Sequence, residues 1–325
     1  MIVSDERPEV SVIVPVFNEA DNLAELVDRV HAAMTGCARS FELLVVDDGS
    51  RDGTPQMLAR LSGPGRPWLV ALFLSRNYGQ STALQAGFDH ARGRYLVTLD
   101  GDLQNDPDDI PLLLRRLDED TDVDCVSGWR VDRKDGALLR RWPSQIANRL
   151  ISSVTRVRLH DYGCALKAYR RAVIDDLHLY GEQHRFIPAL AAEVGARVAE
   201  VPVRHHPRTS GASKYGIDRT LRVLLDLVWI RFSMRFSTRP IHAFGGAGAL
   251  TALAGLAILL WLTFEKLVLG EQIGGRPLLM LGVMLVLLGA NFLATGLLGE
   301  MLVRIRHEPE GRRQYLLRPP PRDVR

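Results

Sequence analysis

Two acidic residues separated by a single residue, Asp100 and Asp102, are the part of this sequence that most directly indicates chemistry. They follow Tyr95–Leu99, a short apolar run typical of a buried strand. In extended backbone, residues i and i+2 share a face, so both carboxylates can reach one hard cation. A divalent ion held by oxygen ligands can grip the diphosphate of a nucleotide and stabilise it as a leaving group. The pair therefore predicts a site for a metal ion and a diphosphate.

Two other polar clusters also follow apolar runs typical of strands: Asn18-Glu19 after Val10–Phe17, and Asp47-Asp48 after Phe41–Val46. Stretches with helical spacing separate these runs, so the pattern predicts an α/β fold, Rossmann-like, with a mostly parallel sheet. Ligands of such sheets bind at the carboxyl ends of the strands. Taken alone, Asp47-Asp48-Gly49-Ser50 would be a helix-capping turn. Its place beside the other clusters favours a binding site.

The C-terminal part of the chain contains two nearly unbroken apolar runs, Ile241–Phe264 and Leu278–Val303. Each is longer than the roughly 20 residues that cross a bilayer as a helix. They predict a transmembrane hairpin, in which Gly245–Gly248 indicates close helix packing and not a phosphate loop. Arginines are concentrated after the second run, which predicts that both termini are cytosolic. The charged N-terminus lacks an apolar signal region, so we expect the large domain to be cytosolic as well.

These features predict four parts, in this order: a catalytic domain over 1–212, an amphipathic juxtamembrane segment over 213–240, the hairpin over 241–303 with spans 241–264 and 278–303, and a basic tail over 304–325. The net charge of +3 comes partly from that tail, which favours contact with membrane lipids over nucleic acid. The three cysteines have no metal-ligand spacing and indicate reduced thiols. His205-His206 lacks a third ligand at fitting spacing, so we expect phosphate or loop contacts there.

Four motifs occur in an order that marks a family: Val-Ile-Val-Pro-Val-Phe-Asn-Glu, Val-Val-Asp-Asp-Gly-Ser, Asp-Gly-Asp-Leu-Gln and Arg-Thr-Ser-Gly-Ala-Ser-Lys. Through them, from residue 10 to about residue 305, the chain resembles family 2 glycosyltransferases of GT-A fold. The hairpin places the resemblance in the polyprenyl-phosphate branch, which includes dolichol-phosphate mannosyltransferases. Asp161-Tyr-Gly-Cys and Arg185-Phe-Ile-Pro further resemble the enzymes that attach formamido-arabinose to undecaprenyl phosphate.

The resemblance implies roles for particular residues. The pocket for the donor base and ribose would be lined by Pro15, Phe17, Glu19, Asp47 and Asp48. Mg²⁺ or Mn²⁺ would be held on the diphosphate by Asp100, Asp102 and Gln104. Phosphate charge would be handled by Arg130, Arg208, Ser213 and Lys214. Alternatives stay open for two residues. Arg130 either handles phosphate charge or belongs to a solvated loop. Asp161 is either an acceptor-side residue or a turn former before Tyr162-Gly163.

The implied activity is the metal-dependent, inverting transfer of a sugar from a nucleotide diphosphate sugar to a polyprenyl phosphate such as undecaprenyl phosphate. A UDP-sugar is favoured as the donor over GDP-mannose. A phosphomonoester has a second pKa of about 6, so the acceptor needs no strong general base at pH 7. The product would serve cell-envelope glycans or lipid A modification at the cytosolic face of the bacterial inner membrane. Family members also imply a homo-oligomer such as a tetramer.

Two rival functions share these features. A processive polysaccharide synthase combines the same catalytic fold with membrane helices, but it carries a Gln-x-x-Arg-Trp motif, and Arg141-Trp142 lacks the glutamine. A membrane-tethered scaffold would bind nucleotide sugar without turnover. The intact set of Asp100, Asp102 and Gln104 favours catalysis over a scaffold. Metal-dependent release of nucleotide diphosphate upon addition of polyprenyl phosphate distinguishes the two.

Overall fold

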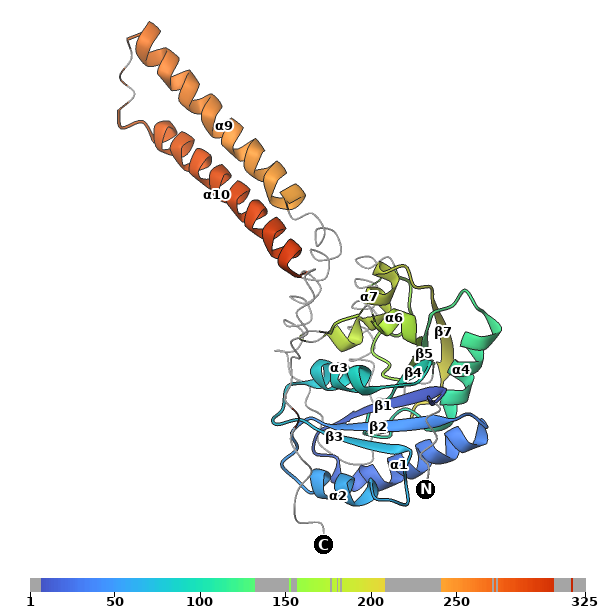
Figure 1. Cartoon of the computed structure of the whole chain (residues 1–325). Helices are drawn as coiled ribbons and strands as arrows, with labels where there is room; N and C mark the ends of the chain where they lie inside the picture. The colour runs from blue at the N-terminus through green and yellow to red at the C-terminus, as the bar shows by residue number, and fades with distance from the viewer. Residues whose placement is uncertain are drawn as a thin grey trace. The chain divides into compact units, whose positions relative to one another are not determined.

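Seven strands form one sheet in the order β3-β2-β1-β4-β6-β5-β7 (Figure 1). Their bounds are β1 Val10–Val16, β2 Phe41–Asp47, β3 Leu69–Phe73, β4 Tyr95–Thr98, β5 Cys125–Arg130, β6 Lys167–Arg170 and β7 Val198–Val203. Strand β6 runs antiparallel to β4 and β5, and the other described pairs are parallel. The predicted α/β fold with a mostly parallel sheet is confirmed.

The computed structural model describes residues 7–131, 152, 157–175, 177–179, 181, 183–207, 241–270, 272, 274–306 and 317. The chain divides into two units, Met1–Leu227 with Arg313–Arg325, and Val228–Arg312. The expected juxtamembrane segment and most of the basic tail lie outside the described residues.

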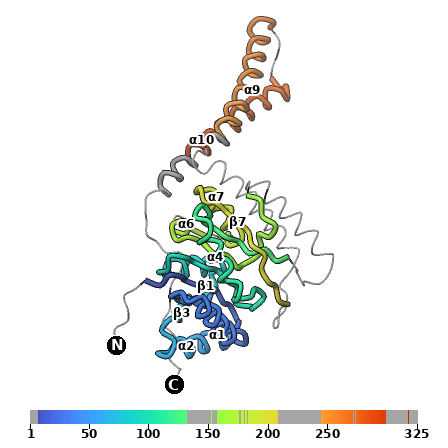
Figure 2. The backbone as a smooth tube through the Cα atoms, turned by 90° about the vertical axis from the view of Figure 1, so that its right-hand side faces the viewer, coloured from blue at the N-terminus to red at the C-terminus, as the bar shows by residue number. Residues whose placement is uncertain are grey.

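Helices cover both faces of the sheet (Figure 1 and Figure 2). One face packs against α1 (Ala20–Gly36), α2 (Thr54–Leu61) and α4 (Ile110–Glu119), and the other against α3 (Gln80–His90), α6 (Arg171–Asp175) and α7 (Ile187–Glu193). The described part of this unit also includes two short 3₁₀ turns, η1 (Pro107–Asp109) and η2 (Gln183–Arg185). Parallel strands covered on both faces need continuous apolar runs, which explains the composition of β1 and β2.

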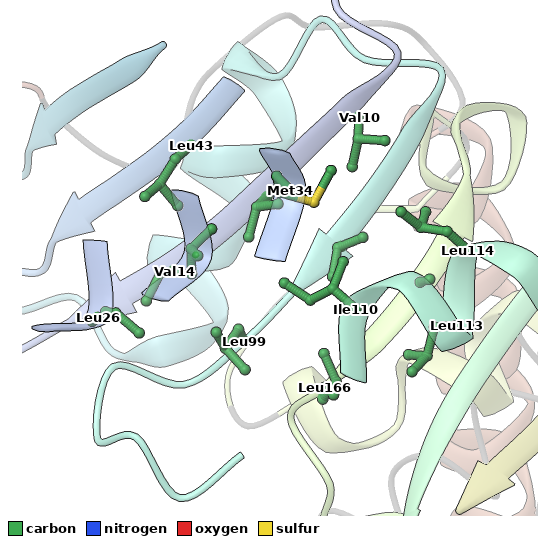
Figure 3. Close-up of a cluster of buried hydrophobic side chains, with 14 of the residues drawn as sticks. Val10, Val14, Leu26, Met34, Leu43, Leu99, Ile110, Leu113, Leu114 and Leu166 are labelled. Carbon is green, nitrogen blue, oxygen red and sulfur yellow. The ribbon is translucent and has the colours of Figure 1, made fainter. Parts of the chain in front are cut away.

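The helical spacing of the sequence accounts for the way α1 packs. Leu23, Leu26, Val27 and Val30 are fully buried and recur at the intervals that place side chains on one face of a helix. Leu26 and Met34 of this helix belong to the same buried cluster as Val14 of β1 (Figure 3). The cluster holds the central strands in register and so fixes where their carboxyl ends lie.

Two features of the second half of the sheet differ from expectation. One alternative placed Arg130 in a solvated loop, but β5 continues to Arg130 because it pairs with β7 up to Arg130↔Val203. Strand β6 was not expected at all, since its four residues begin with a lysine and end with an arginine. Long-range pairing between strands overrode the local pattern in both places.

One described residue near the C-terminus, Leu317, pairs with the chain just after β3. Leu317 forms an isolated antiparallel bridge with Leu74, the residue after β3. Leu317 belongs to the same unit as the sheet.

The second unit contains two long helices, α9 (Ile241–Val268) and α10 (Pro277–Arg306). Their stretches Phe244–Val268 and Pro277–Leu298 are long and apolar enough to cross a membrane, in agreement with the predicted hairpin. Gly248 and Gly289 lie where the helices touch, since a Cβ on Gly248 would lie 2.9 Å from the Gly289 carbonyl oxygen. The close packing predicted for the glycines is therefore confirmed at Gly248.

Candidate active site

The three polar clusters lie at the carboxyl ends of three neighbouring strands, β2, β1 and β4. Asp47 is the last residue of β2 and pairs with Val16 at the end of β1. Asp100 follows β4, whose continuation is held by a hydrogen bond from the Leu99 amide to the Ile13 carbonyl at 3.1 Å. The structure therefore brings together, at one edge of the sheet, acidic residues that are far apart in the sequence.

The loops after β1 and β2 are linked by hydrogen bonds. Asp47 is buried, and its Oδ1 accepts the amide of Ser50 at 3.1 Å. The hydroxyl of Ser50 in turn accepts the amide of Asn18 at 2.9 Å, and that of Thr54 accepts the amide of Glu19 at 2.9 Å. These bonds hold the residues that we expect to line the donor pocket. Pro15 and Phe17 are half-buried in and just after β1.

Asp48 organises a third loop. Its two carboxylate oxygens accept the amides of Tyr78 and Gly79 at 2.7 and 2.9 Å. Burial raises the pKa of this carboxyl above its usual range, against the effect of the two hydrogen bonds. Asp48 thus holds the loop between β3 and α3 in place. The sequence analysis assigned it only to the donor pocket.

A glycine permits the close approach of that loop. Gly49 has φ +69°, a conformation that side chains with a Cβ rarely adopt. A Cβ built at this position would lie 2.3 Å from the Arg76 carbonyl carbon, far inside van der Waals contact. The Asp47-Asp48-Gly49-Ser50 turn is therefore shaped by a backbone contact as well as by its charges.

The Asp100 and Asp102 pair is held from both sides. The side-chain amide of Gln80, the first residue of α3, donates to Asp100 Oδ1 at 2.7 Å. Asp102 Oδ1 accepts the amide of Gln104 at 3.2 Å across a tight turn whose middle residue, Leu103, has φ +57°. Burial and the Asp102 charge raise the pKa of Asp100 to about 6, against the opposing charges of Lys167 and Arg130.

The oxygen atoms of this pair fit a hard divalent cation. Among the described residues, no cluster of three or more acidic, histidine or cysteine side chains could enclose a metal ion. Two carboxylates that leave the remaining positions to phosphate oxygens and water are typical of a Mg²⁺ site for nucleotides. The residues present therefore match a metal that binds together with a diphosphate.

Arg130 and Asp161 form a buried ion pair. Arg130 Nε donates to Asp161 Oδ2 at 2.6 Å and Nη2 to Oδ1 at 3.0 Å, and the two side chains are 10% and 5% exposed. The Asp161 carboxylate holds the pKa of Arg130 above its ordinary value although burial opposes this. Arg130 is thus not part of a solvated loop. Asp161 also accepts the Gly163 amide at 3.1 Å, so it does form the expected turn.

Lys167 is a functional candidate that the sequence analysis missed. Its side chain is buried next to the acidic pair, and its ammonium group donates to the Cys164 carbonyl oxygen. Burial lowers its pKa, while the charges of Asp161 and Asp100 oppose that effect. A lysine within the apolar run Cys164–Tyr169 was the only local signal.

His184 supports the same region from η2. The Ser81 hydroxyl, next to Gln80 on α3, lies 3.0 Å from His184 Nδ1 and accepts the His184 amide at 3.0 Å. Burial, with the nearby charges of Arg185 and Lys167, lowers the pKa of His184 to about 3. The imidazole is therefore neutral at physiological pH. Arg208, Ser213 and Lys214 lie outside the described residues.

A mostly parallel sheet with acidic residues at its carboxyl edge is an α/β fold of the class that binds ligands at that edge, and comparison with known proteins identifies the family. The family model described as glycosyl transferase family 2 matches residues 11–178. The dodecaprenyl-phosphate galacturonate synthase of Rhizobium johnstonii is 47% identical over 312 residues, covering 95% of this chain and 92% of that protein. An undecaprenyl-phosphate 4-deoxy-4-formamido-L-arabinose transferase of Klebsiella pneumoniae is 39% identical, with the same coverage. The chain belongs to glycosyl transferase family 2 and is a glycosyltransferase.

Solved structures of lower identity share the fold. Mannosyl-3-phosphoglycerate synthase from Rubrobacter xylanophilus has a TM-score of 0.56 at 18% identity, covering 70% of this chain and 75% of that one. Glucosyl-3-phosphoglycerate synthase from Mycobacterium tuberculosis, in complex with Mn²⁺ and UDP-glucose, has a TM-score of 0.52 at 16% identity, with 70% and 79% covered. At these identities the likeness extends to the fold alone.

Proposed function

We propose that this glycosyltransferase moves a sugar from a nucleotide diphosphate sugar to a polyprenyl phosphate, with inversion at the anomeric carbon. The observation that carries the proposal is the Asp100 and Asp102 pair, which lies at the same sheet edge as Asp47 and is held by Gln80. The acceptor class is supported by the two relatives, which are named for transfer to dodecaprenyl and undecaprenyl phosphate.

On the donor side, we assign the base and ribose to Pro15, Phe17, Glu19, Asp47 and Asp48, and the diphosphate to Asp100, Asp102 and Gln104. A bound Mg²⁺ or Mn²⁺ would supply the positive charge that stabilises the departing diphosphate. The hydrogen bond from Gln80 orients the Asp100 carboxylate before the donor arrives. We favour a UDP-sugar, and galacturonate is the first sugar to test, because the relative named for it shares 47% of its residues with this chain.

On the acceptor side, an oxygen of the lipid phosphate attacks the anomeric carbon while the bond from that carbon to the donor diphosphate breaks. The phosphate is mostly dianionic at pH 7, so the chain needs no strong general base to activate it. The chain must instead offset the repulsion between two anions. We assign this task to Arg130, which Asp161 holds in position, together with Arg208, Ser213 and Lys214.

The membrane hairpin explains how a lipid substrate could be used. Residues of α9 and α10 such as Leu260 and Leu287 expose large apolar side chains that suit a bilayer. We propose that the hairpin anchors the catalytic unit at the cytosolic face of the inner membrane, with both termini in the cytosol. The isoprenoid tail of the acceptor would remain in the bilayer while its phosphate enters the site. We further propose a homo-oligomer such as a tetramer.

The test uses the full chain in nanodiscs with undecaprenyl phosphate, Mn²⁺ or Mg²⁺, and a panel of radiolabelled donors that includes UDP-galacturonate, UDP-formamido-arabinose and GDP-mannose. We expect lipid-extractable label with one donor, and loss of that label with EDTA. Asp100→Asn and Asp102→Asn should each lower turnover by about 100-fold or more, the scale on which removal of a transition-state contact acts.

Each other outcome has a clear meaning. Full transfer by a variant in which both Asp100 and Asp102 are replaced by alanine would refute the assigned role of the pair. A product that carries a chain of many sugars would indicate a polysaccharide synthase. Donor binding without transfer from any donor would indicate a scaffold.

A further inference from the structure

Asp106 is a buried carboxylate that contacts two arginines and a histidine. Its side chain is 4% exposed, and it contacts Arg29 Nη2 at 2.6 Å, His206 Nε2 at 2.9 Å and Arg204 Nη1 at 3.3 Å. It also accepts the amide of Asp108 at 3.1 Å. Asp106 lies four positions after Asp102, in the loop that we assign to the diphosphate.

Asp109 holds the same arginine from a second side. Its Oδ2 accepts the Arg204 amide at 2.6 Å, and its Oδ1 accepts Arg204 Nε at 2.9 Å. The Asp109 side chain is 10% exposed, whereas that of Arg204 is 54% exposed. Both the backbone and the side chain of Arg204 are therefore held by one fixed carboxylate.

Backbone contacts join the same two segments. The His206 amide donates to the Gln104 carbonyl at 2.8 Å, and Asn105 and His205 form an isolated antiparallel bridge. Strands β4 and β7 are separated by β6 and β5, a distance of about 14 Å at the usual spacing of strands. The loop after β4 must therefore cross the sheet edge to meet the chain that leaves β7.

Carboxylates buried in this way are costly unless cations and hydrogen bonds satisfy them. Here the partners of both carboxylates include residues of the chain leaving β7, so the charge pairs hold two segments together across the edge of the sheet. We propose that Asp106 and Asp109 are positioning residues for sugar transfer: by holding Arg204 and His206, they fix the end of β7 against the loop that carries Asp102 and Gln104.

The consequence for the reaction rests on the proposed function. The loop after β4 carries the residues assigned to the donor diphosphate, and Arg208, assigned to phosphate charge, follows Pro207 in the sequence. If the two segments shift relative to each other, donor and acceptor phosphates lose their alignment. A displacement of about 1 Å can slow an enzyme by roughly 100-fold.

The experiment compares Asp106→Asn and Asp109→Asn with Asp108→Asn in the full chain. Asp108 is the matched control, because it is an exposed carboxylate in the same turn whose side chain forms no hydrogen bond or ion pair with Arg204 or His206, while its charge still acts on Arg204. We expect kcat to fall about 10- to 100-fold in the first two variants. The donor KM should change less than threefold, because the ends of β1 and β2 are untouched, and Asp108→Asn should stay within twofold of the wild type.

Hydrogen exchange supplies a readout that does not need turnover. Exchange at the His206 amide, measured by mass spectrometry on peptides that cover 203–207, should accelerate in Asp106→Asn and Asp109→Asn but not in Asp108→Asn. His206→Gln serves as a milder variant if the aspartate variants fold poorly. It removes only one contact of Asp106, and the His206 side chain is 43% exposed. The variant His206→Gln should also accelerate exchange at the backbone amide of position 206.

A double-mutant cycle separates direct contact from general charge. Asp109→Asn combined with Arg204→Gln should be no slower than the slower single variant, because both remove one contact. Unchanged exchange and unchanged kcat in Asp106→Asn and Asp109→Asn overturn the inference, as does a lower Tm with full activity per folded molecule. An inactive wild type and control would instead refute the proposed function, and the exchange data would still decide the positioning role.

Discussion

Arg130 and Asp161 meet through two parallel hydrogen bonds, although 31 positions separate them in the sequence. Such a fork is selective for arginine, because a lysine ammonium cannot reproduce its planar geometry. Asp161 is itself supported at its backbone, where its amide donates to Glu200 Oε1 at 3.2 Å. The pair therefore links β5 to β7 through the turn that contains Tyr162 and Gly163.

Removal of one partner should leave a buried charge unpaired. We expect Asp161→Ala to cost about 3–5 kcal/mol of stability, which lowers Tm by roughly 10 °C in a unit of this size. Arg130→Lys should also lower the rate of transfer. Thermal unfolding of the full chain in detergent checks the first effect, and the transfer assay checks the second. The double variant Arg130→Met with Asp161→Leu should recover most of the stability but none of the activity. If the double variant were as unstable as the single variants, this account would be wrong.

Gly49 should tolerate no side chain. Gly49→Ala places a Cβ in contact with the Arg76 backbone at a positive φ, so the loops around the proposed donor pocket must move. We expect a loss of about 1–3 kcal/mol and a clearly raised donor KM. Gly53→Ala in the same turn is the control, because its Cβ would meet only Ala20 Cβ at 3.6 Å. Similar behaviour of the two variants would argue against the backbone contact as the cause.

His184 should make the catalytic unit sensitive to acid. Its pKa in the folded chain is lowered to about 3 from an ordinary value of 6.5, so between these values the unfolded chain binds a proton that the folded chain does not. Stability from this residue is therefore fully present above pH 6.5 and declines as the pH falls toward 3. His184→Asn keeps a polar group near Ser81 but does not titrate. Its Tm should fall less than that of the wild type between pH 7.5 and pH 5, and an identical fall in both proteins would exclude His184 as the cause.

The membrane hairpin should depend on Gly289. A Cβ at this position would lie 2.6 Å from the Ala252 amide nitrogen and from the Gly248 carbonyl oxygen. Gly289→Leu should therefore force α9 and α10 apart and reduce the Tm of the full chain in detergent. Gly246→Leu is the matched control, since no atom lies within 4 Å of the corresponding Cβ. Equal losses from both substitutions would indicate a general effect of bulk.

Much of the catalytic unit follows from local pattern. The apolar runs of β1, β2 and β4 and the helical spacing of α1 are properties of short segments, so they were predictable. Strand β6 and the last residues of β5 were not, because they exist through pairing with distant strands. The same distinction holds in the site. Asp100 and Asp102 were evident from their spacing, whereas nothing near Gln80 indicated that it would bind Asp100.

Features that depend on neighbours in the chain could be read from the residues alone: acidic pairs at strand ends, an α/β order of elements, and two apolar helices. The tertiary structure decided which charges meet. Asp161 is paired with Arg130, Asp48 holds the loop before α3, Lys167 is buried beside the acidic pair, and Asp106 lies against His206, 100 positions later in the chain. The physical reason is that charge partners are set by the order of strands in the sheet, and that order is a property of the folded chain as a whole.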